Sequence, residues 1–247
     1  MPGGWEVVAT AGVVLVSGVI VGLAGFGFAP FAVPPLLFLH DPPTVVALVL
    51  LLGFTSGLVV VWGEWREIAT RTRRALLPWS FTGLAVGAII LRYVDELVIK
   101  VLASVVVAAF APFMAAGFRL PGTAHPLSTV VAGFASGVLG SSAGLPGPPI
   151  ARLFTARNLP PATFRVTITS YFVIIDVVAL ALLIASSQVH RAELLLALSM
   201  APAALLGRWT GRSLADRIAP AAFRQVVIGL LLVTGATGAA GAIISLS

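Results

Sequence analysis

Several apolar runs, each long enough to cross a lipid bilayer, constrain this chain more than any other feature. A helix of about 20 apolar residues spans the hydrocarbon core. With 59% hydrophobic and only 10% charged residues, the chain is too apolar for a water-soluble globule, so we predict an all-α integral membrane protein. Ten apolar runs are present, of which six are long enough to span the membrane and four are short or flank a break. They cover residues 7–24, 31–39, 45–62, 75–91, 97–118, 127–139, 150–154, 163–185, 194–209 and 223–246.

One stretch of these runs is broken by small residues and prolines between Gly133 and Pro149, in the sequence GFASGVLGSSAGLPGPP. The bilayer core offers no water to irregular backbone, so such a break survives only inside protein or beside a polar cavity. Pro148 and Pro149 suit the first turn of a helix, where the missing N–H is no loss. We therefore expect a new helix to begin there, with its positive dipole end facing a gap that an anion can occupy.

The charge and the residue types exclude several functional classes. The net charge of +6 comes from arginines between apolar runs, which is a membrane-topology signal and lacks the basic stripe of a nucleic-acid binder. The chain has no cysteine, and its three histidines are too scattered in sequence for a metal cluster. No phosphate-binding loop of the form G-x4-G-K-[ST] is present. We expect no nucleic-acid partner, no metal and no cofactor.

The two halves of the chain repeat each other, which divides it into residues 1–120 and 121–247. Pro78, Gly83, Gly87 and Lys100 recur at one constant offset as Pro202, Gly207, Gly211 and Arg224. The glycine spacing of Gly18, Gly22 and Gly25 likewise matches that of Gly133, Gly137 and Gly140, and a proline break follows in each half. Two broken helices in corresponding positions predict a site between the two repeats.

Loop charge indicates that the repeats are inverted. The segment 64–74 holds four arginines and is expected in the cytoplasm, where Lys and Arg collect. Inverted repeats then leave only Arg92, Lys100 and Arg191 outside, whereas parallel repeats place most of the 15 cations outside. Each repeat is expected to contain a broken helical hairpin, residues 7–39 or 127–154, and about three crossings.

The glycines have two candidate roles, close helix packing and a substrate site. Small residues spaced by three allow close helix packing, and we favour this role for Gly18, Gly22, Gly83, Gly87, Gly207 and Gly211. We favour a substrate site for the glycines beside the prolines, which are Gly25, Gly27, Gly144 and Gly147.

Polar residues in apolar surroundings supply the other candidates. Arg152 and Arg165 flank the second break, where a guanidinium either binds an oxyanion through two nitrogens or reaches the interface. Hydroxyl donors cluster near the same gap, and either bind substrate or bond the preceding helical turn: Ser141, Ser142, Thr169 and Tyr171. Asp176 lies in the middle of an apolar run and is either a proton carrier or the ion-pair partner of Arg165 or Arg152. Glu64 is expected in a loop without a role.

Three motifs carry a family resemblance: GFGFAPFAVP at residues 25–34, GLPGPP at residues 144–149, and the run from Pro161 to Phe164 and Arg165. At these motifs the chain resembles the TauE/SafE family of membrane transporters, which are associated with export of sulfite and organosulfonates. It differs where Phe28, Ala29 and Pro146 replace glycines that are common in the family.

The resemblance implies a multi-pass secondary transporter of the cell inner membrane that exports a small anion, sulfite or an organosulfonate, by alternating access between the two broken helices. The alternatives are an anion channel, which the same donors could line, and a membrane-embedded enzyme, for which we find no nucleophile and base pair. A non-transporting assembly partner and a homodimer also stay open.

Overall fold

The computed structural model describes residues 4–24, 27–115, 126–156, 160–215 and 229, and over these ranges it contains helices and no strand. The all-α class is thereby confirmed for the described residues. Five helices in these ranges are long and apolar enough to cross a membrane, as predicted: α1 (Gly4–Ala24), α3 (Pro42–Glu64), α4 (Thr70–Tyr93), α8 (Pro161–Ala185) and α9 (Arg191–Ala215). The last apolar run, residues 223–246, lies outside the described residues except for Gly229.

Four further α-helices and one short 3-10 helix complete the described part: α2 (Phe28–Leu36), η1 (Trp65–Glu67), α5 (Glu96–Ala115), α6 (Pro126–Ala143) and α7 (Gly147–Ala156). Prolines stand in the first turns of α3, α7 and α8, because their missing N–H has no partner there. The predicted helix start at Pro148 and Pro149 is confirmed, since α7 begins one residue earlier at Gly147.

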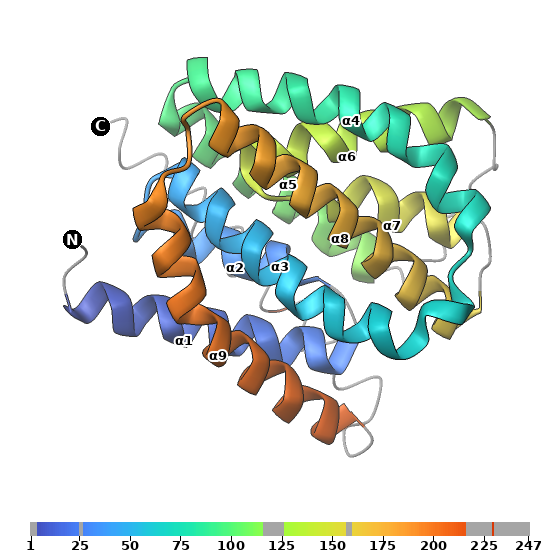
Figure 1. Cartoon of the computed structure of the whole chain (residues 1–247), viewed down its shortest axis with the longest axis horizontal. Coiled ribbons are helices and arrows are strands. Elements are labelled where there is room, and N and C mark those ends of the chain that lie inside the picture. The colour runs from blue at the N-terminus through green and yellow to red at the C-terminus, as the bar shows by residue number, and fades with distance from the viewer. Residues whose placement is uncertain (1–3, 25–26, 116–125, 157–159, 216–228, 230–247) are drawn as a thin grey trace.

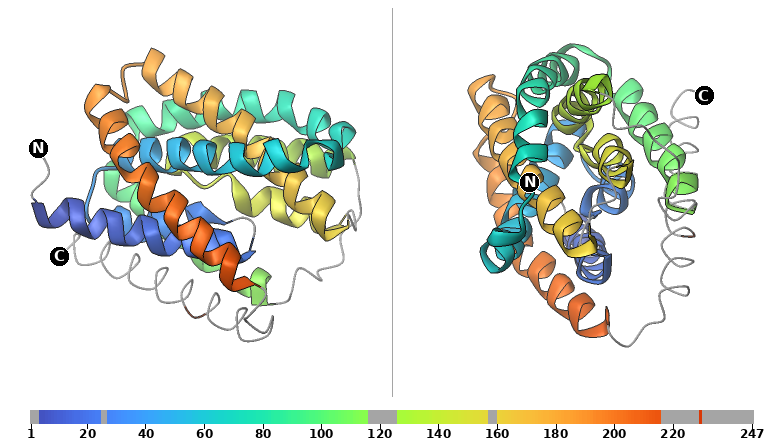
Figure 2. Two further views of the ribbon diagram at one scale, coloured as in Figure 1. Left: turned by 60° about the horizontal axis from the view of Figure 1, so that its bottom comes forward. Right: turned by 90° about the vertical axis from the view of Figure 1, so that its right-hand side faces the viewer.

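The helices form three groups that lie side by side (Figure 1). Helices α4 and α6 pack along one edge and α1 and α9 along the opposite edge, while α3 and α8 pack against each other between them. The two further views in Figure 2 agree with this arrangement. The short helix α2 packs on α1 and α3, and α7 packs on α6 and α8, so each broken hairpin lies next to the central pair.

The two outer pairs touch through glycine, which confirms the close-packing role of these residues. A Cβ atom added at Gly18 would lie 2.6 Å from the Ala204 carbonyl oxygen, and one at Gly133 would lie 2.9 Å from the Leu76 carbonyl oxygen. No side chain fits so close to a neighbouring backbone. Small residues therefore set the distance between the helices of each outer pair.

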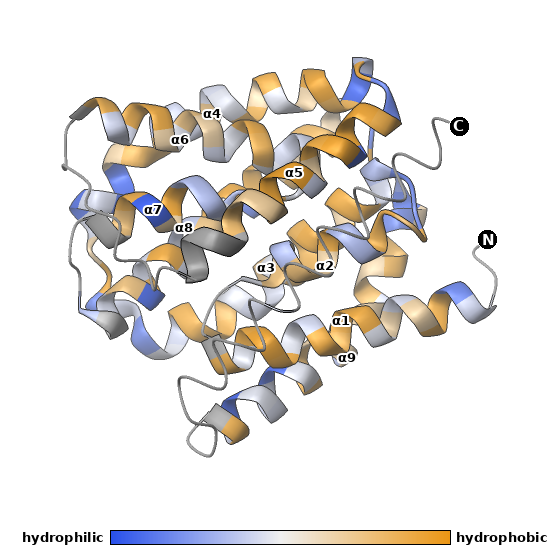
Figure 3. Ribbon diagram, turned by 180° about the vertical axis from the view of Figure 1, so that it is seen from behind, coloured by the Kyte–Doolittle hydropathy of each residue, from blue (hydrophilic) through white to orange (hydrophobic). Residues whose placement is uncertain are grey.

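The outside of the bundle is apolar along the helices (Figure 3). All five tryptophans of the chain are exposed, as expected for anchors at the membrane interface, with Trp62 at 87% and Trp209 at 70%. Large apolar side chains such as Val8 and Leu206 are exposed as well. In lipid such a surface carries no penalty, so it fits a multi-pass membrane protein.

Candidate functional site

The two helix breaks are built around glycines with left-handed backbone. Gly27 has φ of +100° just before α2, and Gly144 has φ of +70° just after α6. At the second break the Gly144 N–H donates to the Gly140 carbonyl, and the Leu145 N–H donates to the Leu139 carbonyl at 2.9 Å. This is the capping pattern that ends helices at a left-handed glycine, and L side chains rarely adopt its φ.

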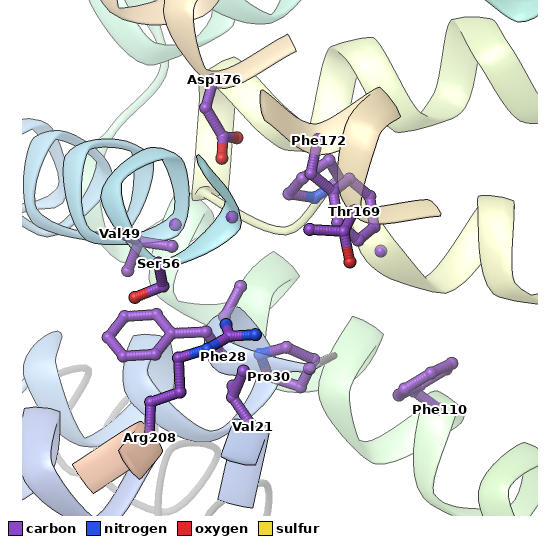
Figure 4. A pocket seen from close by; sticks show the side chains of 16 residues that line it. Val21, Phe28, Pro30, Val49, Ser56, Phe110, Thr169, Phe172, Asp176 and Arg208 are labelled. Atoms are coloured by element: carbon purple, nitrogen blue, oxygen red, sulfur yellow. The ribbon is translucent and has the colours of Figure 1, made fainter. Parts of the chain in front are cut away.

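Both breaks border one cavity of about 70 Å³, shown in Figure 4. The first break contributes residues 27–30 and the second contributes Pro146 and Gly147. The walls come from α1, α3, α5, α8 and α9, through Val21, Val49, Gly53, Ser56, Gly57, Phe110, Thr169, Phe172, Asp176 and Arg208. The cavity has room for about five water-sized groups, which matches a small oxyanion.

Two charged side chains face each other across this mainly apolar cavity. Figure 4 shows the Asp176 carboxylate pointing into it from α8, and the Arg208 guanidinium pointing into it from α9 on the other side. Asp176 is only 5% exposed. The hydroxyl-bearing residues Ser56 and Thr169 line the same cavity. The Arg208 guanidinium and the Ser56 hydroxyl are donors that suit the oxygens of an anion.

The contact between α3 and α8 shapes the polar wall of the cavity. A Cβ atom added at Gly53 would lie 2.8 Å from the Asp176 Oδ2 atom, and one at Gly57 would lie 2.6 Å from the Val173 Cγ2 atom and 3.4 Å from the Thr169 Cγ2 atom. The two glycines thus leave space on α3 for the side chains of α8, including that of Asp176. At the end of this contact, Arg165 Nη2 lies 2.7 Å from Glu64 Oε1.

Four of the sequence-predicted site residues line the cavity: Gly27, Gly147, Thr169 and Asp176. Gly25 lies outside the described residues. The Thr169 hydroxyl also donates to the Arg165 carbonyl at 2.8 Å, so its free lone pairs, rather than its proton, face other groups in this conformation.

Ser141 and Ser142 are buried and do not line the cavity. Ser141 donates to the Gly137 carbonyl at 3.2 Å and Ser142 donates to the Val138 carbonyl at 2.7 Å, each one turn earlier in its own helix. Ser141 also lies 2.7 Å from the Leu84 carbonyl of α4. These contacts follow the alternative in which serine bonds backbone inside a helix. Gly144 also lies off the cavity lining and serves as the cap of α6.

Tyr171 belongs to a buried hydrogen-bond network behind the second break. Its hydroxyl donates to the Ser136 Oγ atom at 2.9 Å and lies 2.7 Å from the Ser80 Oγ atom. Ser136 in turn donates to the Pro146 carbonyl at 2.7 Å. The network ties α4, α6 and α8 to the residue that borders the cavity, and Tyr171 itself is absent from the lining.

The arginines beside the second break are placed differently from each other. Arg152 is exposed, whereas Arg165 pairs with Glu64 on α3. The expectation that Glu64 is a loop residue without a role was wrong, because it is the last residue of α3 and is the partner of Arg165. In this structure Arg165 is therefore not the ion-pair partner of Asp176.

Sequence reasoning missed Arg208, Ser56 and Gly53 as cavity residues. Two signals were available for them. Arg208 stands between Gly207 and Gly211, and the corresponding position between Gly83 and Gly87 in the first half is a leucine. On α8, residues 169, 172 and 176 follow the spacing of one helix face, which marks the side that the facing helix α3 must accommodate.

Comparison with known proteins gives one result. A family model described as "Sulfite exporter TauE/SafE" matches residues 10–238. Neither the curated proteins nor the solved structures contain a match. The matched residues include both helix breaks, the cavity between them and all three helix pairs.

Proposed function

The chain belongs to the sulfite exporter TauE/SafE family, whose members are membrane transporters and not enzymes, and from this premise we propose that it exports sulfite or a small organosulfonate through the cavity between its two helix breaks. The observation that carries the proposal is the cavity itself. Both breaks meet there, and the Arg208 guanidinium points into it. Irregular backbone and an intramembrane cation at one place are typical of a transporter's substrate site.

Recognition of the anion follows from the donors around the cavity. The guanidinium of Arg208 offers two parallel N–H groups to two oxygens of a sulfite or sulfonate group. Ser56 adds a hydroxyl, and Gly147 at the start of α7 presents a helix N-terminus, where an anion is favoured. Phe28, Phe172 and Val49 form an apolar part of the wall that suits the short carbon chain of an organosulfonate.

We also propose that the two repeats are inverted and rock against each other to alternate access. The support is the equivalent packing of the outer pairs. In each pair, α1 on α9 and α6 on α4, a hairpin helix of one half packs on the Pro-x4-Gly-x3-Gly helix of the other half. The topology test places single cysteines at Arg71 and Arg217, which should react with an impermeant thiol reagent from the same, cytoplasmic, side. Reaction from opposite sides would rule out inversion.

Counterflow in liposomes tests the transport function. Purified protein in vesicles loaded with unlabelled sulfite should accumulate radiolabelled sulfite transiently, because a carrier exchanges the two through one site. Arg208→Gln should abolish the accumulation. Arg92→Gln is the matched control, since Arg92 is an exposed cation at the end of α4, away from the cavity. A flux without counterflow would identify a channel, and no sulfite flux at all would refute the proposed function.

A further inference from the structure

The cavity holds two opposite charges that are not paired by direct contact. Among the described residues, neither Asp176 nor Arg208 makes a recorded ion pair or side-chain hydrogen bond. Asp176 is almost fully buried, and Arg208 is half-buried. Their side chains approach the same space from α8 and α9. The two opposite charges therefore border one space that a small anion fits.

No other titratable group of the described residues lines this space. Helix α3 presents Gly53 and Ser56 to Asp176, and the two breaks present only glycine, proline, alanine and phenylalanine. On α8 itself the nearest titratable group is Tyr171, whose hydroxyl is occupied by Ser80 on α4 and Ser136 on α6. Among the described residues, a proton that enters the cavity thus has one carboxylate to bind, that of Asp176.

Beyond the cavity, three charged groups act on Arg208. The cations of Arg165 and Arg212 oppose its charge, and the carboxylate of Glu64 favours it. Arg165 and Glu64 neutralise each other through their own contact of 2.7 Å, and Arg212 is exposed. Within the cavity, then, the charge balance depends on Arg208, Asp176 and whatever binds between them.

Membrane interiors strongly disfavour a net charge, so the site should stay neutral in each state. When it is empty, the cation of Arg208 is balanced by the anionic form of Asp176. When an anion binds to Arg208, a second negative charge on Asp176 would repel it and leave the site negative. We propose that the cavity binds an anion and a proton together, with the anion on Arg208 and the proton on Asp176.

This inference rests on the proposed function and adds to it the coupling of anion binding to proton binding. It makes Asp176 the proton site of the transporter, and it requires the protein to take up one proton for each monoanion bound. Anion affinity should then fall about tenfold for each pH unit across the range where Asp176 is protonated in the anion-bound protein but not in the empty protein. It should level off below that range, where the empty protein is protonated already, and above it, where neither state holds the proton.

Proton uptake can be measured directly. Purified protein is titrated calorimetrically with methanesulfonate, which remains a monoanion throughout, between pH 5.5 and 8.5 in buffers that differ in ionisation enthalpy. The dependence of the observed heat on the buffer gives the number of protons bound per anion. We expect about one proton for the parent protein, and close to none, with an affinity nearly independent of pH, for Asp176→Asn. Glu96→Gln, which removes a surface carboxylate paired with Lys100 on α5, is the matched control and should behave as the parent.

The outcomes separate the coupling from the function. Methanesulfonate binding without proton uptake overturns the proton site and leaves the anion site in place. Uptake that persists in folded Asp176→Asn assigns the proton elsewhere and also overturns the inference. If the parent binds neither methanesulfonate nor sulfite at any pH, the proposed function fails and the coupling with it. The proton count of the parent needs no variant, so it decides whether anion binding is coupled to a proton even if Asp176→Asn does not fold.

Discussion

The two outer helix pairs, α4 with α6 and α1 with α9, have the same packing and different chemistry. In each pair, two glycines of the Pro-x4-Gly-x3-Gly helix face backbone carbonyl oxygens of the partner helix: Gly83 faces Phe134, Gly87 faces Val138, Gly207 faces Leu15 and Gly211 faces Val19. Backbone against backbone is the closest approach that two helices make. Both halves of the chain thus use one device to fix a hairpin against a long helix.

The difference lies in the residue that follows the first glycine. In α4 it is Leu84, which is fully buried in the apolar core. In α9 it is Arg208, which points into the cavity between the breaks. The same glycine packing therefore occurs in both pairs, and the residue after the first glycine decides whether a pair contributes an apolar core residue or a charge to the cavity.

Exchanging these two residues gives the largest expected effects. Leu84→Arg buries an uncompensated cation, which costs roughly 3–5 kcal/mol and should remove the protein from the membrane fraction. Arg208→Leu should insert at normal yield, because the cavity wall is already mainly apolar, yet lose anion binding in calorimetry. Yield and monodispersity by size-exclusion chromatography check both variants. Comparable yields of folded protein for the two would show that the positions are not as different as we argue.

Filling the glycine contacts should damage both pairs alike. Gly83→Leu and Gly207→Leu each drive a side chain into the partner's backbone, and such overpacking costs about 1–3 kcal/mol or more. The thermal unfolding midpoint in detergent should decrease by a similar amount for both. The exposed Gly63, at which an added Cβ atom meets nothing within 4 Å, provides the control Gly63→Ala. A strong effect in only one pair would break the equivalence of the two.

The helix packing and the helix starts could be predicted from the sequence because the signals for them are local. Glycines spaced by three or four residues lie on one helix face, and prolines at the first turn mark helix starts, so the packing glycines and the start of α7 were identified. The meeting of both breaks was expected from the repeat alone. These features depend on chain neighbours or on internal symmetry, both of which can be read from one sequence.

The site chemistry was harder to predict because it depends on long-range neighbours. Arg165 pairs with Glu64, which is 101 positions away. Ser141 and Thr169 both lie near the second break in sequence, yet only Thr169 lines the cavity. Arg208 was counted among cations that orient the protein. The signal that sets it apart is the comparison of the two repeats, in which Arg208 stands where the first half has Leu84. Which way a helix turns its polar residue is decided by the helix packed beside it.

The Tyr171 hydrogen-bond network on the α4 and α6 side should contribute to stability and not to anion binding. Tyr171→Phe removes the hydroxyl that joins Ser80 and Ser136 behind the second break. Losing these buried hydrogen bonds should decrease the free energy of unfolding by about 1–3 kcal/mol. Anion affinity at saturating protonation should change less than about threefold, because Tyr171 does not line the cavity. A large loss of affinity in a stable variant would instead place Tyr171 in contact with the anion.

The smallest expected effect is a pH dependence confined to the α1 side. His40, in the turn before α3, lies 2.7 Å from the Thr10 hydroxyl of α1, and burial lowers its pKa below the usual 6.5, against the opposing effects of Glu6 and Asp41. On acidification the unfolded chain therefore takes up this proton at a higher pH than the folded chain does. The stability that neutral His40 contributes is full above about pH 6.5 and decreases as the pH falls from there toward the folded pKa.

His40→Gln tests this dependence because it keeps a polar side chain that does not titrate. Its unfolding midpoint should change less between pH 7.5 and 5 than that of the parent, in a background of Asp176→Asn that removes the carboxylate of the cavity. The contact of α4 with α6 should not contribute, because α6 carries no titratable side chain and the arginines of α4 keep their charge in this range. If the parent and His40→Gln lose stability equally on acidification, the pH dependence arises elsewhere and the two outer pairs do not differ in this respect.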